Sequence, residues 1–405
     1  MSAHHSKQPT YEGVREDVAG TQEARHRRRA VMAMFTAVLV PLLLVMAAIT
    51  IDLGAMMNAR ADLQDAADSA AMAGVSAFTS DAMMSVRMGS NVSTSLADVL
   101  NWTSDRSSSF SLLNPTFGAA GTQVAQGDIV PGWLDLVSDT SSVVPNPAPA
   151  TYNAVRVTVQ RAADGANGPV NFFFASIFGQ HTGETTATAT AVFDDRVAGF
   201  DPEKGNLMPF TIDKDEYERQ FLEGDDAFEY DPGTGYISPG NDGVREINLY
   251  PYDMAPGNFG LLNIGTENEG NPGLQDHIEN GVSAADMELE TGSPILTFYD
   301  DEGTPETYDI TGDPGIKSTL ESSVETKIGQ VVAFLLHDQV TEGGSNSVYR
   351  ITSIRFARVM EVELQTNSSG RGLWLQPVTY SGPALVFSRT APSSGGAGGR
   401  IVLAR

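Results

Sequence analysis

The side chains that could carry out chemistry in this 405-residue chain are scattered, and they form no familiar catalytic set. The chain has no cysteine, which excludes a thiolate nucleophile or metal ligand. His181, His277 and His337 stand alone, and no H-x-x-x-H pair, G-x-S-x-G elbow or G-x-x-x-x-G-K-[ST] loop occurs. A hydrolase would need one of these histidines in a convergent pocket. We therefore predict a protein that is not an enzyme and needs no cofactor.

One string could bind a metal ion. Asp105, Ser107 and Ser109 match D-x-S-x-S, the metal-ion-dependent adhesion motif of von Willebrand factor A domains. That motif follows a buried strand, so that the carboxylate and hydroxyls converge on magnesium. Here the preceding DVLNWTS is a poor strand, and a serine-rich loop explains the string better. Acidic turns at 225–226, 241–242 and 300–302 could bind calcium, but none has EF-hand spacing, so we predict no metal site.

The element that must position the rest of the chain is the uncharged segment 30–51. As a helix it would be about 33 Å long, which is enough to cross a bilayer. Four arginines immediately before it (Arg25, Arg27, Arg28 and Arg29) predict a cytoplasmic N-terminus and an exported remainder. A cleaved signal peptide is the alternative, although its apolar core would run only about 7–15 residues. Pro41 is compatible with a membrane helix.

The charge balance agrees with export. The chain has 25 Lys and Arg against 51 Asp and Glu, a net charge of −26. So acidic a chain stays soluble and argues against nucleic acid or anionic lipid headgroups as its partner. No small-molecule substrate is indicated.

The membrane helix is predicted to continue beyond Ile51 as an amphipathic helix, since apolar and small residues recur at three- and four-residue spacing. Small residues let a second helix approach closely. This stripe either contacts another helix, in the lipid or just above it, or packs on the chain's own domain, and the sequence leaves both possibilities open. The candidate contact residues are Leu53, Met56, Met57, Leu63, Ala67 and Ala70.

Here the chain closely resembles the N-terminal region of TadE/TadG-like proteins of the tight-adherence (Flp) pilus assembly system. The pattern is a basic run, an apolar span, a D-x-G step and an alanine-rich helix. Processed prepilins carry Gly before their cleavage site and Glu five residues into the mature helix, where this chain has Ala30 and Phe35. The resemblance therefore implies an uncleaved TadG-like anchor. The matching positions are Asp52, Gly54, Arg60, Leu63, Gln64, Ala66, Ala67, Asp68, Ala70, Ala71 and Gly74.

The rest of the chain predicts mixed secondary structure. Residues 91–145 favour loops and short elements, and 154–161 and 184–192 alternate as strands. Residues 168–179 would be a short buried helix or a core strand. Further on we expect strands at 246–250, 331–338 and 373–378, and one long strand or two consecutive strands at 348–365. We expect helices at 274–281 and after Gly315. This second region is also similar to the C-terminal part of TadG-like proteins, at 257–260, Gly281, 312–315 and 354–357, although Arg355 replaces a usual Gly.

We therefore expect an α+β protein: a transmembrane helix that continues into an exported helix, then two mixed α/β exported domains. The expected segments are a cytoplasmic N-terminus (1–29), a span (30–52), two exported domains (53–197 and 198–385) and a Gly/Ser-rich tail (386–405), whose Val402 and Leu403 either join a sheet edge or stay disordered. The resemblance implies a membrane-anchored, non-enzymatic pilus-assembly component of the bacterial inner membrane, with its bulk in the periplasm. The alternative is a membrane-tethered, metal-dependent binding module unrelated to pili.

Overall fold

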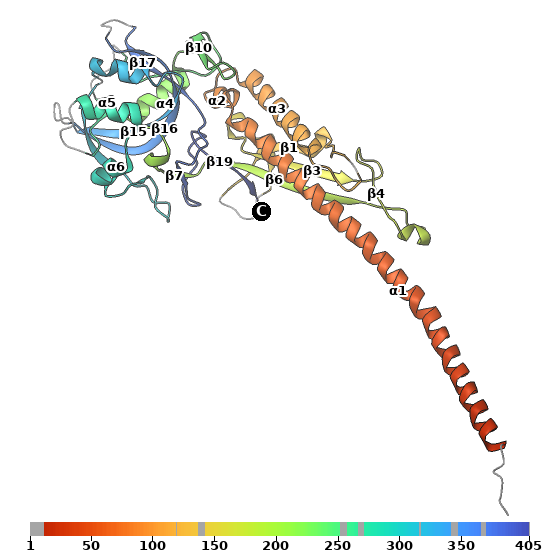
Figure 1. The fold of residues 1–405 in the computed structure, drawn as a ribbon. Coiled ribbons are helices and arrows are strands. Elements are labelled where there is room, and N and C mark those ends of the chain that lie inside the picture. Colours follow the sequence, from red (N-terminus) through yellow and green to blue (C-terminus); the bar gives the residue numbers. More distant parts are fainter. Residues whose placement is uncertain are drawn as a thin grey trace, which may run out of the picture. The chain divides into compact units, whose positions relative to one another are not determined.

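The computed structural model describes residues 12–118, 120–136, 142–251, 257–265, 271–315, 317–341, 347–365 and 370–404 (Figure 1). The fold is α+β, as predicted, with a long N-terminal helix followed by strands and shorter helices. The chain divides into two compact units. The first comprises the residues up to Asp62 together with Gln160–Thr185, and the second comprises Leu63–Val159 and Thr186–Arg405. The domain boundaries proposed near residues 197 and 385 both fall inside the second unit.

Helix α1 (Glu12–Val75) is continuous through Pro41. The side chains of residues 31–51 are exposed, apart from the half-buried Ala48. Among the described residues, Arg27–Thr79 is the one stretch of helix long and apolar enough to cross a membrane. The predicted continuation of the apolar segment into an amphipathic helix is confirmed.

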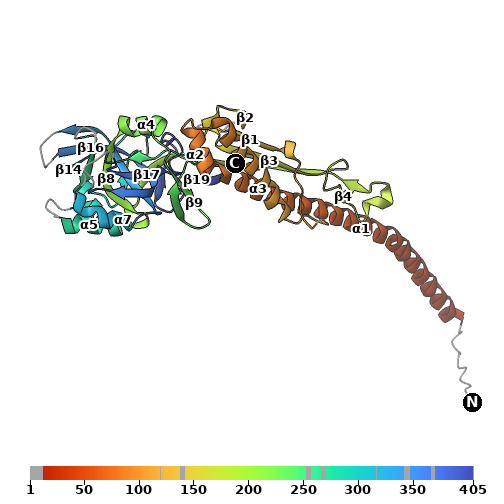
Figure 2. The ribbon, with the colours of Figure 1, turned by 90° about the horizontal axis from the view of Figure 1, so that it is seen from above.

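The remainder of the first unit is a hairpin beside α1 (Figures 1 and 2). Its short strands β4 (Val170–Asn171) and β5 (Thr182–Gly183) are antiparallel, and the 3-10 turn η4 (Ala175–Phe178) connects them. This segment was expected to be a buried helix or a core strand, and that prediction is wrong. Its aromatic side chains are largely exposed, because the hairpin has only one neighbouring element in its unit on which to pack.

In the second unit, helices cover one face of an antiparallel sheet of order β19-β6-β3-β1-β2. Leu63, Ala67 and Ala70 of α1 pack with alternate residues of β3 and β6 in one core. The alternating pattern of β3 produces this face, since every second side chain is buried. The strands are β1 (Ile129–Trp133), β2 (Val144–Pro145), β3 (Ala154–Arg161), β6 (Thr185–Asp194) and β19 (Arg400–Ala404).

Residues 91–145 were expected to form loops and short elements, but the first part of this segment is the long helix α3 (Val92–Leu112), preceded by α2 (Asp81–Arg87). The buried face of α3 consists of Val99 and three small polar residues: Thr103, Ser107 and Ser111 are fully buried. Small side chains suit this position because α3 lies close against Gly74 of α1. Tertiary packing thus overrides the weak helix propensity of serine and threonine.

The C-terminal tail contributes structure to the second unit. Strand β18 (Leu385–Phe387) pairs with β7 (Val197–Phe200), which also pairs with β13 (Leu296–Thr297). Strand β19 joins the edge of β6, with Val402 opposite Val192 and Leu403 opposite Ala191. These apolar residues were expected either to join a sheet edge or to stay disordered, and the structure shows them at a sheet edge.

A second, larger sheet has the order β11-β17-β16-β14-β12-β8-β15 and closes on itself, because β16 also pairs with β15. Residues 348–365 were expected to form one long strand or two consecutive strands, and the structure shows the single strand β16. Strand β8 is buried on both faces and pairs in parallel with β15. The strands are β8 (Leu207–Asp213), β11 (Ile247–Asn248), β12 (Phe259–Leu262), β14 (Tyr308–Pro314), β15 (Val331–Thr341), β16 (Ser347–Glu363) and β17 (Gly372–Pro377).

Helices pack against this sheet. The helix expected at 274–281 is α5 (Asn271–Asn280), and the helix expected after Gly315 is the short α7 (Glu321–Glu325). Strand β8 and the following helix α4 (Lys214–Glu223) were not predicted from the sequence. The apolar run LMPF indicates the strand, and the N-cap residue Asp213 indicates the start of the helix. The remaining elements are η1 (Ser76–Thr79), η2 (Gln126–Asp128), η3 (Pro149–Thr151), η5 (Pro202–Lys204), β9 (Phe228–Asp231), β10 (Tyr236–Pro239), α6 (Ala284–Thr291) and η6 (Ser318–Leu320).

Replacing Gly74 by alanine is expected to destabilise the second unit by about 1–3 kcal/mol, the usual cost of overpacking a filled core. A Cβ at Gly74 would lie 2.3 Å from Ser107 Oγ and 3.3 Å from Val155 Cγ1. Thermal unfolding of the full chain in detergent measures the effect. Gly54 of the same helix is the matched control, because a Cβ there meets nothing within 4 Å. Equal unfolding midpoints for Gly74→Ala and the parent chain would contradict this packing.

Candidate functional site at Asp52 and the aromatic turn

The carboxylate of Asp52 is the polar centre of the first unit. Its Oδ1 accepts a hydrogen bond from the backbone N–H of Phe173 at 2.7 Å. Its Oδ2 accepts hydrogen bonds from Phe174 at 3.1 Å and Ala175 at 2.5 Å. Asp52 is 5% exposed, so an unpaired charge there would be costly. Three charge-assisted hydrogen bonds instead join the first charged residue after the apolar segment to the start of η4.

We call residues 172–178 the aromatic turn. Three of its large apolar side chains are exposed to solvent: Ile177 is 77% exposed, Phe178 64% and Phe173 60%. At the other end, Phe172 packs against Gly183 together with Met56 of α1, where a Cβ on Gly183 would lie 2.5 Å from the Phe172 ring. The same Cβ would lie 2.9 Å from Met56 Sδ of the helix, so a side chain at position 183 would require Phe172 and Met56 to shift.

A small apolar cavity of about 230 Å³ lies between the aromatic turn and α1. The helix contributes Ala48, Ile49, Leu53 and Met56, and the turn contributes rings such as Phe174 and Phe178. Asp52 also borders the cavity, but its oxygens are bound by the turn's N–H groups. Among the residues that line this cavity, Asp52 is the one with a titratable side chain. The other lining residues are apolar, so the cavity favours apolar contacts.

The predicted partner-contact residues of α1 separate into two groups. Leu53 and Met57 are 59% and 65% exposed, so they are available to a partner. Leu63, Ala67 and Ala70 are fully buried in the core of the second unit, where the chain itself fills their contact surface. Partner contact therefore stays a proposal for the exposed positions only. Met56 is half-buried and faces the hairpin.

The three side chains of the D-x-S-x-S string do not converge on one point in this structure. It lies in the middle of α3, where Asp105 and Ser109 are exposed and Ser107 is buried. A helix turns residues i and i+2 to different faces, so Ser107 cannot converge with the other two on one ion. Over the described residues, no group of three or more His, Asp or Glu side chains is placed to hold a metal ion.

Two aspartates of the acidic turns accept hydrogen bonds from backbone N–H groups of the chain. Asp226 accepts hydrogen bonds from the N–H groups of Asp242 and Gly243, and Asp300 accepts them from Glu302 and Thr304. The Asp300 bonds stabilise their own turn, as aspartate commonly does, whereas the Asp226 bonds join two segments that lie 16 residues apart in the sequence.

The three isolated histidines have separate environments. His181 is exposed at the end of the hairpin. His277 Nε2 lies 3.2 Å from an Asp286 oxygen, and His337 is held between Thr211 Oγ1 at 2.9 Å and the carbonyl of Gly257 at 3.0 Å. Burial lowers the pKa of His337 below its ordinary value, so its ring is neutral near pH 7.

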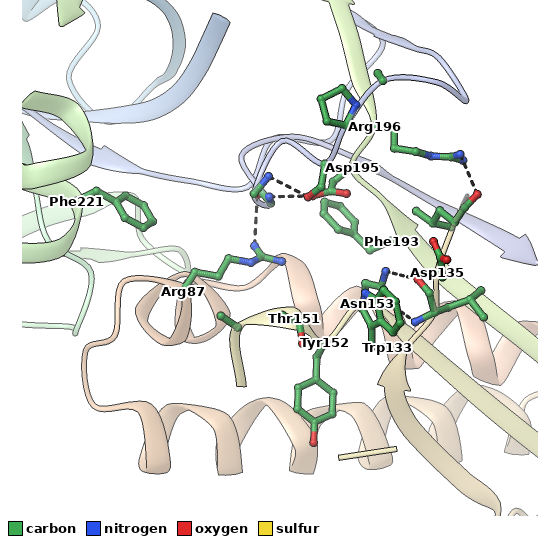
Figure 3. A pocket seen from close by; sticks show the side chains of 18 residues that line it. Arg87, Trp133, Asp135, Thr151, Tyr152, Asn153, Phe193, Asp195, Arg196 and Phe221 are labelled. Atoms are coloured by element: carbon green, nitrogen blue, oxygen red, sulfur yellow. Dashed lines mark hydrogen bonds between the residues drawn. The ribbon is translucent and has the colours of Figure 1, made fainter. Parts of the chain in front are cut away.

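A larger cavity of about 420 Å³ lies in the second unit around Arg87 (Figure 3). The guanidinium donates to Thr379 Oγ1 at 2.9 Å and to the carbonyls of Gly396 and Phe78. Asp195 in turn accepts from the backbone N–H of Gly396 at 3.0 Å. Burial lowers the pKa of Arg87 to about 10, so it stays charged at neutral pH. The hydrogen bonds of Arg87 link α2 to the C-terminal segment. None of the three histidines lines this cavity.

One buried carboxyl has a pKa near neutrality. Glu246 is 4% exposed, and burial raises its pKa from 4.5 to about 8, with Asp226 and Asp242 adding like charge. It accepts hydrogen bonds from the N–H of Ala227 and from Gln376 Nε2. Glu246 could not be singled out from the sequence, because only the fold brings the side chains of these distant residues together.

Replacing Asp52 by alanine is expected to open the aromatic turn, because three N–H groups lose their acceptor at a cost of about 1–3 kcal/mol for each group left buried. Hydrogen–deuterium exchange of the full chain in lipid nanodiscs should become faster at residues 173–175. Asp52→Asn, which keeps one carbonyl oxygen, should give an intermediate effect. Asp65→Ala, an exposed carboxylate of the same helix, is the control. Unchanged exchange in Asp52→Ala would contradict the assigned role.

Glu246 is expected to make stability fall as pH rises from about 4.5 to about 8, because the folded chain binds more protons than the unfolded chain over that range. The variant Glu246→Gln should flatten this dependence. Unfolding midpoints of the full chain between pH 5 and pH 9 measure the effect. Glu288→Gln, at an exposed glutamate, should retain the parent slope. An unaltered slope in Glu246→Gln would exclude Glu246 as its source.

Comparison with known proteins identifies the region that contains Asp52. Residues 30–77 match the Tad family, described as "Putative Flp pilus-assembly TadE/G-like". The match covers the apolar segment, Asp52 and the C-terminal half of α1. The chain matches no curated protein and no solved structure. The resemblance to TadE/G-like pilus-assembly proteins is thereby confirmed over these residues, which supports involvement in Flp pilus assembly.

Proposed function

We propose that this protein is a non-enzymatic, membrane-anchored component of a Flp pilus assembly system, of the TadG-like branch. The observation that carries the proposal is the family match at residues 30–77, which falls on a helix whose apolar part is exposed over about 33 Å. Side chains of this kind are stable in the hydrocarbon of a bilayer and costly in water.

The proposed orientation places the N-terminus in the cytoplasm and the residues after Asp52 in the periplasm. The arginines at 27–29 precede the apolar segment directly, and positive charge is retained on the cytoplasmic side. The acidic remainder of the chain suits a soluble periplasmic part. Because Ala30 and Phe35 replace the Gly and Glu of processed prepilins, the helix stays in the inner membrane as an anchor.

In this role the protein acts by contact. The exposed side chains of Leu53 and Met57, just beyond the apolar segment, are the proposed contact surface for pilus or envelope assembly proteins. This position suits a component that meets pilus proteins at the outer face of the inner membrane.

A photo-crosslinking amino acid at Met57 is expected to capture a protein of the pilus assembly machinery in piliated cells, and deletion of the gene should abolish or strongly reduce pili. Mass spectrometry of the crosslinked product and electron microscopy of the cells measure the two effects. Tyr236, which is 69% exposed and lies outside the matched region, is the control position. Identical capture from both positions, or normal piliation without the gene, would refute the proposal.

A further inference from the structure

We propose that the aromatic turn is a second membrane contact, inserted into the periplasmic interface of the same bilayer that α1 crosses. The inference rests on the proposed anchoring of α1 and adds a lipid-binding site that the family match does not include, since the turn lies outside residues 30–77.

The first argument is the level of the turn along the helix. Asp52 follows the apolar segment directly and is hydrogen-bonded to the first residues of the turn. Met56 lies one helical turn further on and packs at Gly183 of the hairpin. When residues 30–51 cross the hydrocarbon, the turn therefore lies at the bilayer boundary, where interfacial elements bury their apolar side chains by about 5–10 Å.

The second argument is the chemistry of the exposed surface. The exposed side chains of Phe173, Ile177 and Phe178 are apolar, and no Lys, Arg, Asp or Glu occurs between Asp164 and Glu184. Contiguous exposed apolar patches mark protein or membrane contacts. This patch continues the exposed apolar surface of α1, which faces lipid in the proposed orientation. That continuity favours lipid as its occupant over a second protein.

The third argument is that the backbone of the turn is suited to a poorly hydrated environment. Unpaired N–H groups are costly in lipid. Asp52 accepts the N–H groups of residues 173–175, and Phe172 donates to the carbonyl of His181. The N–H groups of Ile177, Gly179 and Gln180 donate to carbonyls within the turn. The buried carboxylate thus lets an irregular segment enter the interface.

The absence of cysteine allows a direct test with single-cysteine variants of the full chain. Ile177→Cys is labelled with an environment-sensitive fluorophore and reconstituted in phosphatidylcholine liposomes, with or without lipids brominated near the top of the acyl chains. We expect blue-shifted emission and quenching by the brominated lipids. Leu289→Cys, at an equally exposed apolar position outside the first unit, carries the same dye and should show neither effect.

A second variant tests whether the rings cause the insertion. Phe173→Ser with Phe178→Ser, in the Ile177→Cys background, should reduce the quenching while the chain remains resistant to carbonate extraction. An unquenched label at 177 in a carbonate-resistant chain would overturn the inference and leave the anchoring of α1 intact. A label shielded only after addition of purified pilus proteins would also overturn it, in favour of a protein contact. A chain that carbonate extracts would refute the anchoring and the inference together.

Discussion

The hydrogen bonds between Asp52 and three consecutive N–H groups join the two parts of the first unit. One partner is the first charged residue after a long apolar helix, and the other is a turn more than 120 positions away in the sequence. Each satisfies a group that would otherwise be buried without a partner. This reciprocal dependence fixes the level at which the aromatic turn lies along α1, and the proposed membrane interface of the protein follows from that level.

Beyond Asp62, the same helix belongs to the second unit. There its stripe of small residues packs on a sheet and against α3, and Gly74 allows the closest approach. The small-residue pattern suits either a partner helix or the chain's own core, because both require short side chains at a helix contact. In this fold the side chains of Leu63, Ala67 and Ala70 are buried in the chain's own core. Leu53 and Met57 keep their side chains free for other contacts.

The polar groups with the most unusual environments are explained by structure. Arg87 holds the C-terminal segment, His337 is bound between a hydroxyl and a carbonyl, and Glu246 shares Gln376 with Asp242. In each case the hydrogen bonds are made to other groups of the chain, although Gln376 Oε1 is buried without a partner. Such buried polar contacts favour a single packed state.

The sequence alone determined the features that depend on local composition and periodicity. These include the uncharged segment, its continuation as an amphipathic helix, the alternation of β3 and the apolar strand β15, since hydrophobic spacing records which face is buried. The resemblance to TadE/G-like proteins also rested on local residue types. The tertiary structure alone decided which partner each face meets. The serine-rich stretch became α3 because its small face fits against Gly74, and the Phe-rich stretch became an exposed turn because Asp52 holds its backbone. Neither outcome could be read from the sequence, because each depends on a contact between residues that are distant in the chain.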